Sequence, residues 1–291
     1  MDIKEFFNSY KSDFDVINTY DESFLNRSDV SIDTLKNIFS CIDLTTLNSY
    51  DNTTNVSEFC DKVISFNKEN PTLPNVAAVC VYPVFASILK SKLEPINVNR
   101  AVVSAGFPSS QTFLETKLDE CKRAIYLGAN EVDIVISVGE MIDGNYEFVM
   151  EEIADIKHSL GDVHLKVILE TGLLINPELI WKASLLSMVA GADFIKTSTG
   201  KVEVSATPEA AWIMTHAIKA YQTKTKKMVG FKPAGGISTV NDALLYWNIQ
   251  RTVLGDKWIT PQYFRIGASR LANNILNEMN KLDNAIPKDW F

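Results

Sequence analysis

The alternation of short apolar runs with amphipathic stretches is the feature of this 291-residue chain that most restricts its fold. Eight apolar runs of five to eight residues follow one another, at 37–44, 76–82, 101–107, 131–138, 164–170, 192–196, 228–232 and 263–267. Their nearly continuous hydrophobicity and their β-branched residues are typical of parallel strands that are covered on both faces. The sequence therefore predicts eight buried strands.

The stretches between these runs have the spacing of helices. Residues 114–127 carry apolar side chains at steps of three and four and stop at Gly128, a common helix terminator. Asn176 and Thr207 each precede a proline, which predicts that helices start there. Strands that alternate with helices predict an α/β protein built as a (β/α)8 TIM barrel. A doubly wound open sheet is the alternative, but no GxGxxG motif follows the first run.

The chain is expected to divide into an extension and the barrel. Residues 1–35 are polar, rich in Asn, Asp and Ser, and weakly helical in pattern, so we expect an N-terminal helical extension. Residues 36–291 are expected to form the barrel, with a short C-terminal tail that begins near residue 284.

The composition restricts the partners and the compartment. A net charge of −8 argues against nucleic acid and anionic membranes as partners, and no apolar run approaches the ~18 residues of a membrane span. The acidic N-terminus lacks the pattern of a targeting peptide, and four irregularly spaced cysteines are typical of reduced thiols, so we expect a cytoplasmic protein. The three histidines form no HxH or HExxH motif, so we expect neither a metal nor another cofactor. A homo-oligomer is left open.

Two lysines stand at the carboxyl ends of predicted strands, where a barrel of this kind places its active site. Lys196 ends the sixth run and Lys232 ends the seventh. Neighbouring strands lie ~4.8 Å apart, so the two ammonium groups would approach each other in the barrel mouth. Like charge and burial both lower a lysine pKa, and a neutral lysine can form a Schiff base with a carbonyl. The alternative is a lysine that simply reaches solvent from a strand end.

Two carboxylates on other strands could serve the same site. Asp133 lies within the apolar run VDIVI, where an unpaired carboxylate would be costly, so it is expected to face cationic partners inside the barrel. A structural ion pair and a proton-transfer group are both open interpretations. Asp43, at the end of the first run, permits the same two interpretations, or the capping of a turn.

Glycine-rich loops follow the last three strands and suggest a phosphate site. They contain Gly200-Lys201, Gly235-Gly236 and Gly267-Ala268-Ser269. Glycine allows backbone N–H groups to converge on an anion, and barrels often bind phosphate after strands seven and eight. Lys201, Ser269 and Arg270 could add side-chain donors. Tight turns are the alternative for each loop, but three of them on adjacent strands favour a phosphate site.

These motifs resemble those of the deoxyribose-phosphate aldolases, a family of Schiff-base-forming, class I aldolases on a (β/α)8 barrel. The matching segments cover all eight runs in order: IDLTTLN (42–48), AAVCVYP (77–83), AGFP (105–108), EVDIVI (131–136), LKVILETG (165–172), GADFIKTSTGK (191–201), VGFKPAGGI (229–237) and RIGAS (265–269). The extension is similar to that of the longer, eukaryotic-type members. The family reversibly cleaves 2-deoxy-D-ribose 5-phosphate to D-glyceraldehyde 3-phosphate and acetaldehyde, in the catabolism of deoxyribose phosphate.

By position, the resemblance implies a role for each candidate residue. Lys196 would be the Schiff-base lysine, Lys232 the neighbour that lowers its pKa, and Asp133 the general acid/base that acts through a water. Asp43 would lie near the substrate hydroxyls, and Cys80 would line the site. The loops after the last three strands would bind the substrate phosphate, and the residues concerned are Thr199, Gly200, Lys201, Gly235, Gly236, Gly267 and Ser269. The implied partners are small phosphorylated sugars and aldehydes.

Two positions depart from the short bacterial members of the family. Arg270 stands where those members have a second serine, and the chain ends in Trp290-Phe291 rather than in a tyrosine. Two other functions remain candidates: another Schiff-base barrel enzyme, such as a transaldolase or a different sugar-phosphate aldolase, and a non-catalytic module that binds phosphate. The paired FIKTSTG and GFKPAGG motifs argue against the first, and the presence of Lys196 and Asp133 argues against the second.

Overall fold

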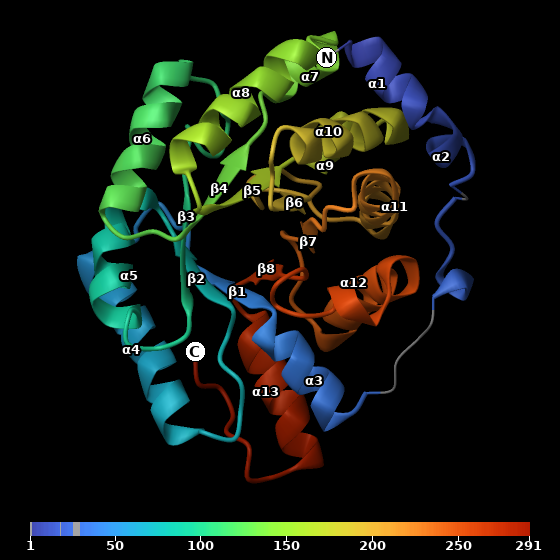
Figure 1. Cartoon of the computed structure of the whole chain (residues 1–291). Helices are drawn as coiled ribbons and strands as arrows, with labels where there is room; N and C mark the ends of the chain where they lie inside the picture. The colour runs from blue at the N-terminus through green and yellow to red at the C-terminus, as the bar shows by residue number, and fades with distance from the viewer. Residues whose placement is uncertain (1, 18, 26–29) are drawn as a thin grey trace.

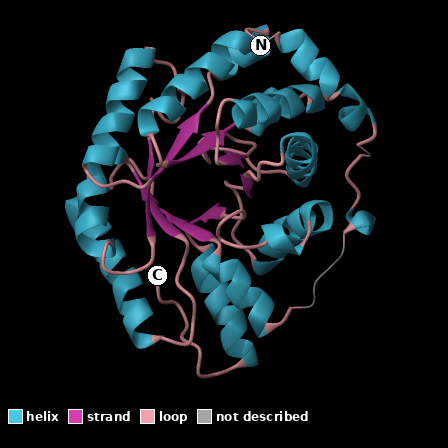
Figure 2. Ribbon diagram, viewed as in Figure 1, coloured by secondary structure: helices cyan, strands magenta, loops and turns pink. Residues whose placement is uncertain are grey.

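Eight parallel strands form the centre of the computed structural model, which describes residues 2–17, 19–25 and 30–291 (Figures 1 and 2). The strands are β1 (Ile42–Thr45), β2 (Ala78–Val81), β3 (Asn99–Val103), β4 (Glu131–Val135), β5 (His164–Ile168), β6 (Phe194–Lys196), β7 (Gly230–Lys232) and β8 (Ile266–Ala268). Each strand overlaps one of the eight apolar runs. The predicted (β/α)8 TIM barrel is therefore confirmed.

The strands follow one another around the barrel in sequence order, and β8 returns to pair with β1. Strands β7 and β8 meet through two isolated bridges, Phe231 to Phe264 and Ala234 to Gly267, which close the ring. Between β6 and β7 the register places Lys196 directly beside Lys232. The fold thus holds the two candidate lysines as neighbours at the carboxyl ends of adjacent strands.

Helices surround the barrel on its outside (Figure 2). They are α1 (Ile3–Ser9), α2 (Lys11–Asp15), α3 (Ile32–Ser40), α4 (Thr53–Glu69), α5 (Ala86–Leu93), α6 (Leu114–Tyr126), α7 (Val138–Asp143), α8 (Tyr146–Leu160), α9 (Thr171–Leu174), α10 (Pro177–Val189), α11 (Pro208–Thr225), α12 (Val240–Leu254) and α13 (Leu271–Leu282), with the short 3-10 helices η1 (Glu22–Phe24), η2 (Pro83–Phe85) and η3 (Asp256–Trp258). Both predicted N-caps are confirmed, because the side chains of Asn176 and Thr207 accept backbone hydrogen bonds at the starts of α10 and α11. None of the helices in the described ranges is long and apolar enough to cross a membrane.

The first apolar run was predicted as a strand throughout, and this is wrong for residues 37–40, which belong to α3. Ser31 caps this helix by accepting a hydrogen bond from the Thr34 backbone N–H. Leu35 and Phe39 are buried on one face at helical spacing, and α3 contacts α12 and α13. The helix runs across the expected boundary at residue 35, and the division into two regions stays a prediction.

The strand side chains alternate between two environments. Those that point outward, such as Leu44, Val132 and Ile195, join the main hydrophobic core between the strands and the helices. Those that point inward near β2 and β3 form a small apolar cluster of Leu47, Ala78, Cys80, Ala101 and Val103. Charged side chains from β1 and β4 to β7, together with Arg265, also occupy the barrel interior and form the lower part of the candidate site.

Helices α1 and α2 lie against the outer helices of the barrel (Figure 1). Tyr10 is buried, and the Lys224 ammonium of α11 lies 3.8 Å from the centre of its ring. The Phe14 ring packs against Trp181 of α10 at a centroid distance of 5.5 Å, and Asp13 forms an ion pair of 2.9 Å with Lys224. The described part of the N-terminal region is therefore packed onto the barrel by aromatic and ionic contacts.

Candidate active site

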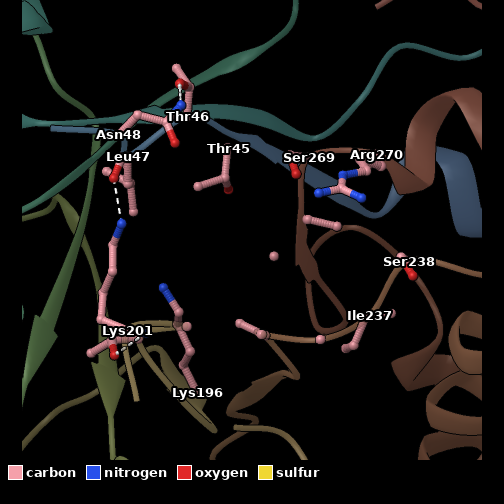
Figure 3. A pocket seen from close by; sticks show the side chains of 17 residues that line it. Thr45, Thr46, Leu47, Asn48, Lys196, Lys201, Ile237, Ser238, Ser269 and Arg270 are labelled. Atoms are coloured by element: carbon pink, nitrogen blue, oxygen red, sulfur yellow. Dashed lines mark hydrogen bonds between the residues drawn. The ribbon is translucent and has the colours of Figure 1, made fainter. Parts of the chain in front are cut away.

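A cavity of about 420 Å³ opens at the carboxyl ends of β6, β7, β8 and β1 (Figure 3). Its lining includes most of the predicted site residues, namely Lys196, Thr199, Gly200, Lys201, Gly235, Gly236, Gly267 and Ser269. Residues 45–48, at the end of β1 and in the loop after it, supply a further wall that was not predicted, as do Ile237 and Ser238. The structure thus brings the predicted nucleophile and the predicted phosphate loops to one cavity.

Lys196 and Lys232 share a single carboxylate oxygen. The Lys196 Nζ donates to Asp133 Oδ2 at 2.8 Å, and the Lys232 Nζ donates to the same oxygen at 2.7 Å. Lys232 is fully buried, whereas Lys196 keeps 4% of its surface exposed and lines the cavity. Of the two amines, only the one on Lys196 lies where a substrate carbonyl could reach it.

The surroundings move the pKa values of the two lysines in opposite directions. Burial lowers the pKa of Lys196, and the neighbouring Lys232 charge lowers it further, against the opposing effect of Asp133. Burial alone would also lower the pKa of Lys232, but the carboxylates of Asp133 and Asp43 outweigh it and raise that pKa. Lys196 therefore loses its proton more readily than Lys232 does.

The two predicted carboxylates are fully buried inside the barrel. Asp133 binds Lys196 and Lys232 through Oδ2 and Lys166 through Oδ1, the last at 3.0 Å. Burial alone would raise its pKa, but these three lysines hold the pKa of Asp133 well below its usual range. Asp43 accepts from Lys232 at 2.5 Å through Oδ2 and does not line the cavity. Its proximity to substrate hydroxyls stays a prediction.

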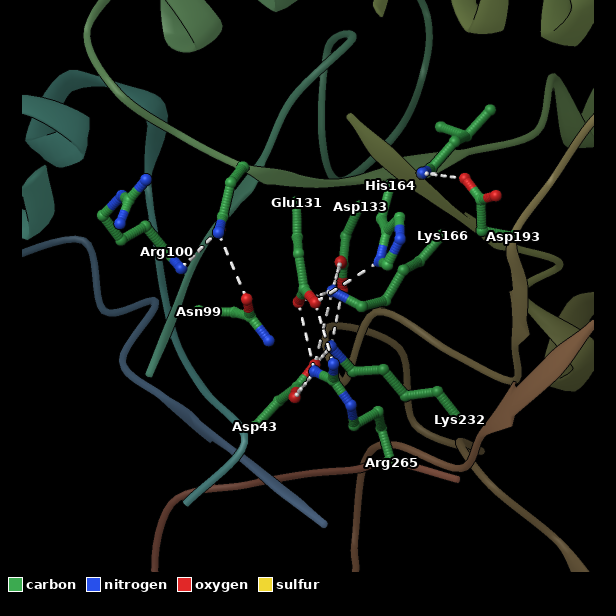
Figure 4. Close-up of polar contacts among 12 residues, drawn as sticks. Asp43, Asn99, Arg100, Glu131, Asp133, His164, Lys166, Asp193, Lys232 and Arg265 are labelled. Carbon is green, nitrogen blue, oxygen red and sulfur yellow. Dashed lines mark hydrogen bonds and ion pairs between the residues drawn. The ribbon is translucent and has the colours of Figure 1, made fainter. Parts of the chain in front are cut away.

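Three charged residues that were not predicted, Glu131, Lys166 and Arg265, complete this ionic group (Figure 4). Lys166 donates to Glu131 Oε2 at 2.6 Å, and the Arg265 guanidinium binds Glu131 Oε1 at 2.8 Å and Asp43 Oδ1 at 2.7 Å. All three lie within apolar runs, at the start or middle of a strand or just before one. The signal that identified Asp133, a charged residue inside an apolar run, would have identified them too.

Hydroxyl side chains after β6 hold the cavity loops in place. The Thr197 Oγ1 accepts from the Ala234 backbone N–H at 2.9 Å, which ties the end of β6 to the loop after β7. The Thr199 hydroxyl donates to Glu170 Oε2 at 2.6 Å and accepts from the Lys201 backbone N–H at 3.0 Å. Thr197 and Thr199 thus fix the loop that carries the rest of the cavity wall.

Two glycines are required by the close approach of the loops. Gly235 has φ of +88°, and a Cβ there would lie 2.5 Å from the Ser205 Cβ. A Cβ on Gly267 would lie 2.9 Å from the Ala234 Cβ and 3.2 Å from Lys232 Cε. Both positions therefore have a structural reason for glycine, and the binding of phosphate by these loops stays a prediction.

Basic groups border the cavity at its mouth. Lys201 reaches across it and donates to the Leu47 carbonyl at 2.5 Å (Figure 3). Ser269 and Arg270 are exposed and line the wall at the start of α13, where Arg270 is the N-cap residue. Free backbone N–H groups at a helix start attract anions. The mouth is thus positively charged although the whole chain has a net charge of −8.

Cys80 lies in the apolar cluster of the barrel interior rather than in the cavity wall. Burial raises the pKa of its thiol to about 11, so the group is a neutral thiol near pH 7. Its predicted contact with substrate stays a prediction. Among the described residues, no cluster of three His, Cys, Asp or Glu side chains has the geometry to hold a metal ion.

This chain matches a family model and is similar in sequence to known aldolases. The family model described as DeoC/LacD family aldolase matches residues 38–253. The chain is similar to deoxyribose-phosphate aldolase of Homo sapiens, with 41% identity over 245 residues, covering 80% of this chain and 77% of the human one. The Bos taurus deoxyribose-phosphate aldolase is 40% identical over 247 residues, which cover 81% of this chain and 77% of the bovine one.

A crystal structure of a Coccidioides immitis protein has the same fold. Its TM-score is 0.75 at 24% identity, and the match covers 96% of this chain and 98% of that one. The family model spans most of the barrel, from α3 to α12. We conclude that this chain belongs to the DeoC/LacD aldolase family.

Proposed function

We propose that this protein is a deoxyribose-phosphate aldolase that reversibly cleaves 2-deoxy-D-ribose 5-phosphate to D-glyceraldehyde 3-phosphate and acetaldehyde. The observation that carries the proposal is the position of Lys196, whose amine faces the cavity while Lys232 and Asp133 lie behind it. The substrate comes from the named relatives, which are 40% or more identical over most of the chain. A small phosphorylated sugar is also the kind of ligand that a cavity of about 420 Å³ with basic groups at its mouth would accept.

Lys196 would act as the nucleophile. Its neutral amine attacks the C1 aldehyde of the open-chain sugar, and loss of water from the adduct gives a protonated Schiff base. This cation draws the electrons of the C2–C3 bond as that bond breaks, which releases D-glyceraldehyde 3-phosphate and leaves an enamine on Lys196. Protonation of the enamine at C2 and addition of water then release acetaldehyde and restore the amine.

Asp133 and Lys232 would move the protons of this cycle. The C3 hydroxyl loses a proton when the bond breaks, and C2 gains one, so the cycle needs a group that stores a proton between the steps. The low pKa of Asp133 keeps its carboxyl ionised near pH 7, whereas Lys232 keeps its proton. Lys196 and Lys232 both bind Asp133 Oδ2, so Asp133 would relay protons between Lys232 and the substrate. A water would carry the proton where the Asp133 carboxylate does not reach the substrate directly.

The loops after β6, β7 and β8 would hold the phosphate. Gly235, Gly236 and Gly267 leave the backbone accessible on one wall of the cavity, and the start of α13 lies beside them. Lys201 and Arg270 would add positive charge at the mouth. Binding the phosphate there would set the distance from the anion to Lys196 and so place C1 at the amine.

Turnover of the sugar with and without its phosphate tests this function. We expect the phosphorylated sugar to be cleaved with a kcat/KM at least about 100-fold higher than that of 2-deoxyribose, since several charge-assisted hydrogen bonds are lost together. Inorganic phosphate should compete with the phosphorylated sugar. Equal turnover of the two sugars would exclude the phosphate site, and no cleavage of either would exclude the activity. The cytoplasmic location stays a prediction.

A further inference from the structure

The charged group inside the barrel contains more basic side chains than acidic ones. We call it the barrel cluster, and its members are Asp43, Glu131, Asp133, Lys166, Lys196, Lys232 and Arg265. Figure 4 labels all of them except Lys196, which is labelled in Figure 3. The three carboxylates are each at most 1% exposed, and none of the four basic side chains is more than 4% exposed. Buried charges that water cannot solvate must be balanced by one another. Three carboxylates balance three of the four cations.

The four basic side chains are not equally paired. Lys166 lies within 3.5 Å of all three carboxylates, at 2.6 Å from Glu131, 3.0 Å from Asp133 and 3.5 Å from Asp43. Lys196 contacts Asp133 alone, through an oxygen that also binds Lys232. The cation with the weakest pairing is thus the one that faces the cavity.

Arg265 and Lys232 are paired with two carboxylates each. Arg265 binds Asp43 at 2.7 Å and Glu131 at 2.8 Å, and its guanidinium lies 5.5 Å from the Phe194 ring centre. Lys232 binds Asp43 at 2.5 Å and Asp133 at 2.7 Å. These pairings leave Lys196 as the group that loses its proton most readily.

No other charge in the described part of the chain offsets this imbalance from inside the barrel. His164 lies 3.8 Å from Glu131, but its side chain is 52% exposed at the opposite end of β5. The Cys80 thiol is neutral near pH 7 because burial raises its pKa to about 11. Glu170, which binds Thr199 after β5, is a buried carboxylate that forms no ion pair with the described members of the barrel cluster. Lys201 is a cation at the cavity mouth that binds the Leu47 carbonyl. Since these two groups outside the cluster carry opposite charges, together they leave the positive excess unchanged.

We propose that Lys166, Arg265 and Glu131 are positioning residues that fix the charge of the barrel cluster so that Lys196 is its one neutral base. Lys166 and Arg265 occupy the inner oxygens of the three carboxylates, so these oxygens cannot turn toward Lys196. Glu131 limits the positive excess to a single charge, which allows Lys232 to stay protonated. The reactivity of Lys196 is then a property of the whole cluster and not of the neighbouring lysine alone.

This inference rests on the proposed function, because Lys196 is taken as the reacting amine. Its test is the pH dependence of kcat/KM, whose acidic limb reports the protonation of the free enzyme. Lys166→Met removes a cation, so Lys196 should hold its proton more tightly and the limb should move to higher pH. Glu131→Gln removes a carboxylate, and the limb should move to lower pH. Each shift should be about one pH unit, the size that a neighbouring charge commonly produces.

The double variant Lys166→Met with Glu131→Gln is the sharpest arm of the experiment. It removes one charge of each sign and restores a single excess cation, so its limb should return to within about 0.3 pH units of the wild-type position. Lys117→Met is the matched control, because Lys117 is also a buried lysine, paired at 2.5 Å with Glu152 on the neighbouring helix α8, outside the barrel cluster. It should lower the melting temperature and leave the limb in place.

The outcomes separate the two proposals. Wild-type protein without an acetaldehyde adduct on Lys196 would remove the proposed function, whatever the variants do. Given that adduct, a limb that stays at the wild-type pH in both single variants would overturn the inference. The inference would also be overturned if the acidic limb of the double variant lay as far from the wild-type pH as that of either single variant. If Lys166→Met does not fold, Glu131→Gln, which keeps the shape of the side chain, decides by the direction of its shift.

Discussion

At the scale of single residues, two physical criteria located the candidate residues in the sequence. Lys196 and Lys232 were found because they end adjacent predicted strands, where a barrel has its active site, and Asp133 because a charge inside an apolar run must have a partner. The structure brings the three together around one oxygen. The second criterion was not applied to Lys166 or Arg265, although both lie within apolar runs. What the sequence could not supply is the pairing, because that depends on strand register and on the direction of each side chain.

Arg270 is a residue-scale departure from the family pattern that leads to a prediction. It lines the cavity wall as the N-cap of α13, and Figure 3 shows its guanidinium beside Ser269. We expect Arg270→Ser to raise KM for the phosphorylated sugar about tenfold with kcat little changed, since an exposed charge binds the ground state and the transition state equally. Steady-state kinetics check this, with Lys281→Ser at the far end of α13 as the control.

An unchanged KM in Arg270→Ser would mean that the glycine loops hold the phosphate without the guanidinium. A loss in kcat at constant KM would place Arg270 in the chemistry instead. Either result would contradict the role given to it here.

At the scale of elements, eight strands and the starts of α6, α10 and α11 could be predicted, but the other helix starts and several ends could not. The run 131–138 is apolar to its end, yet β4 stops at Val135 because α7 begins at Val138. In the first run, periodicity could not distinguish the end of α3 from the start of β1, since both are buried. Burial fixes where apolar residues lie, whereas hydrogen bonding to a neighbouring element fixes where a strand starts and stops.

The N-terminal helices give the element-scale prediction. Tyr10 is 3% exposed and packs against Phe6 and Lys224. If α1 and α2 fold together with the barrel, Tyr10→Ala should lower the free energy of unfolding by about 3 kcal/mol, as loss of a buried aromatic ring does. Thermal and denaturant unfolding measure it, with Val16→Ala as the control, because Val16 is 75% exposed.

A Tyr10→Ala variant with the unfolding midpoint of the wild type would show that the extension separates from the barrel before the barrel unfolds. In that case residues 1–35 would be an appendage that does not support the barrel. The pH profile of turnover should stay unchanged in either case, since the extension does not border the cavity.

At the scale of the whole molecule, the position of the site follows from the way the barrel closes. Strands β7 and β8 meet through two bridges only among the described pairings, and the cavity lies at the carboxyl end of this seam. The charged side chains of the interior come from β1 on one side of this seam and from β4 to β7 on the other, with Arg265 just before β8, and the small apolar cluster comes mainly from β2 and β3. The order of strands could be predicted from the alternation of runs, but the separation of ionic and apolar side chains within the barrel emerged only from the assembled register.

The central claim is that Lys196 is the group that forms the Schiff base. The most direct test is reduction with borohydride in the presence of acetaldehyde, followed by peptide mass mapping. The account predicts one ethyl group on Lys196, no label on the fully buried Lys232, and no adduct in Lys196→Met. Labelling of Lys232 or of Lys201 at the mouth in place of Lys196, or complete absence of a label in wild-type protein, would contradict it.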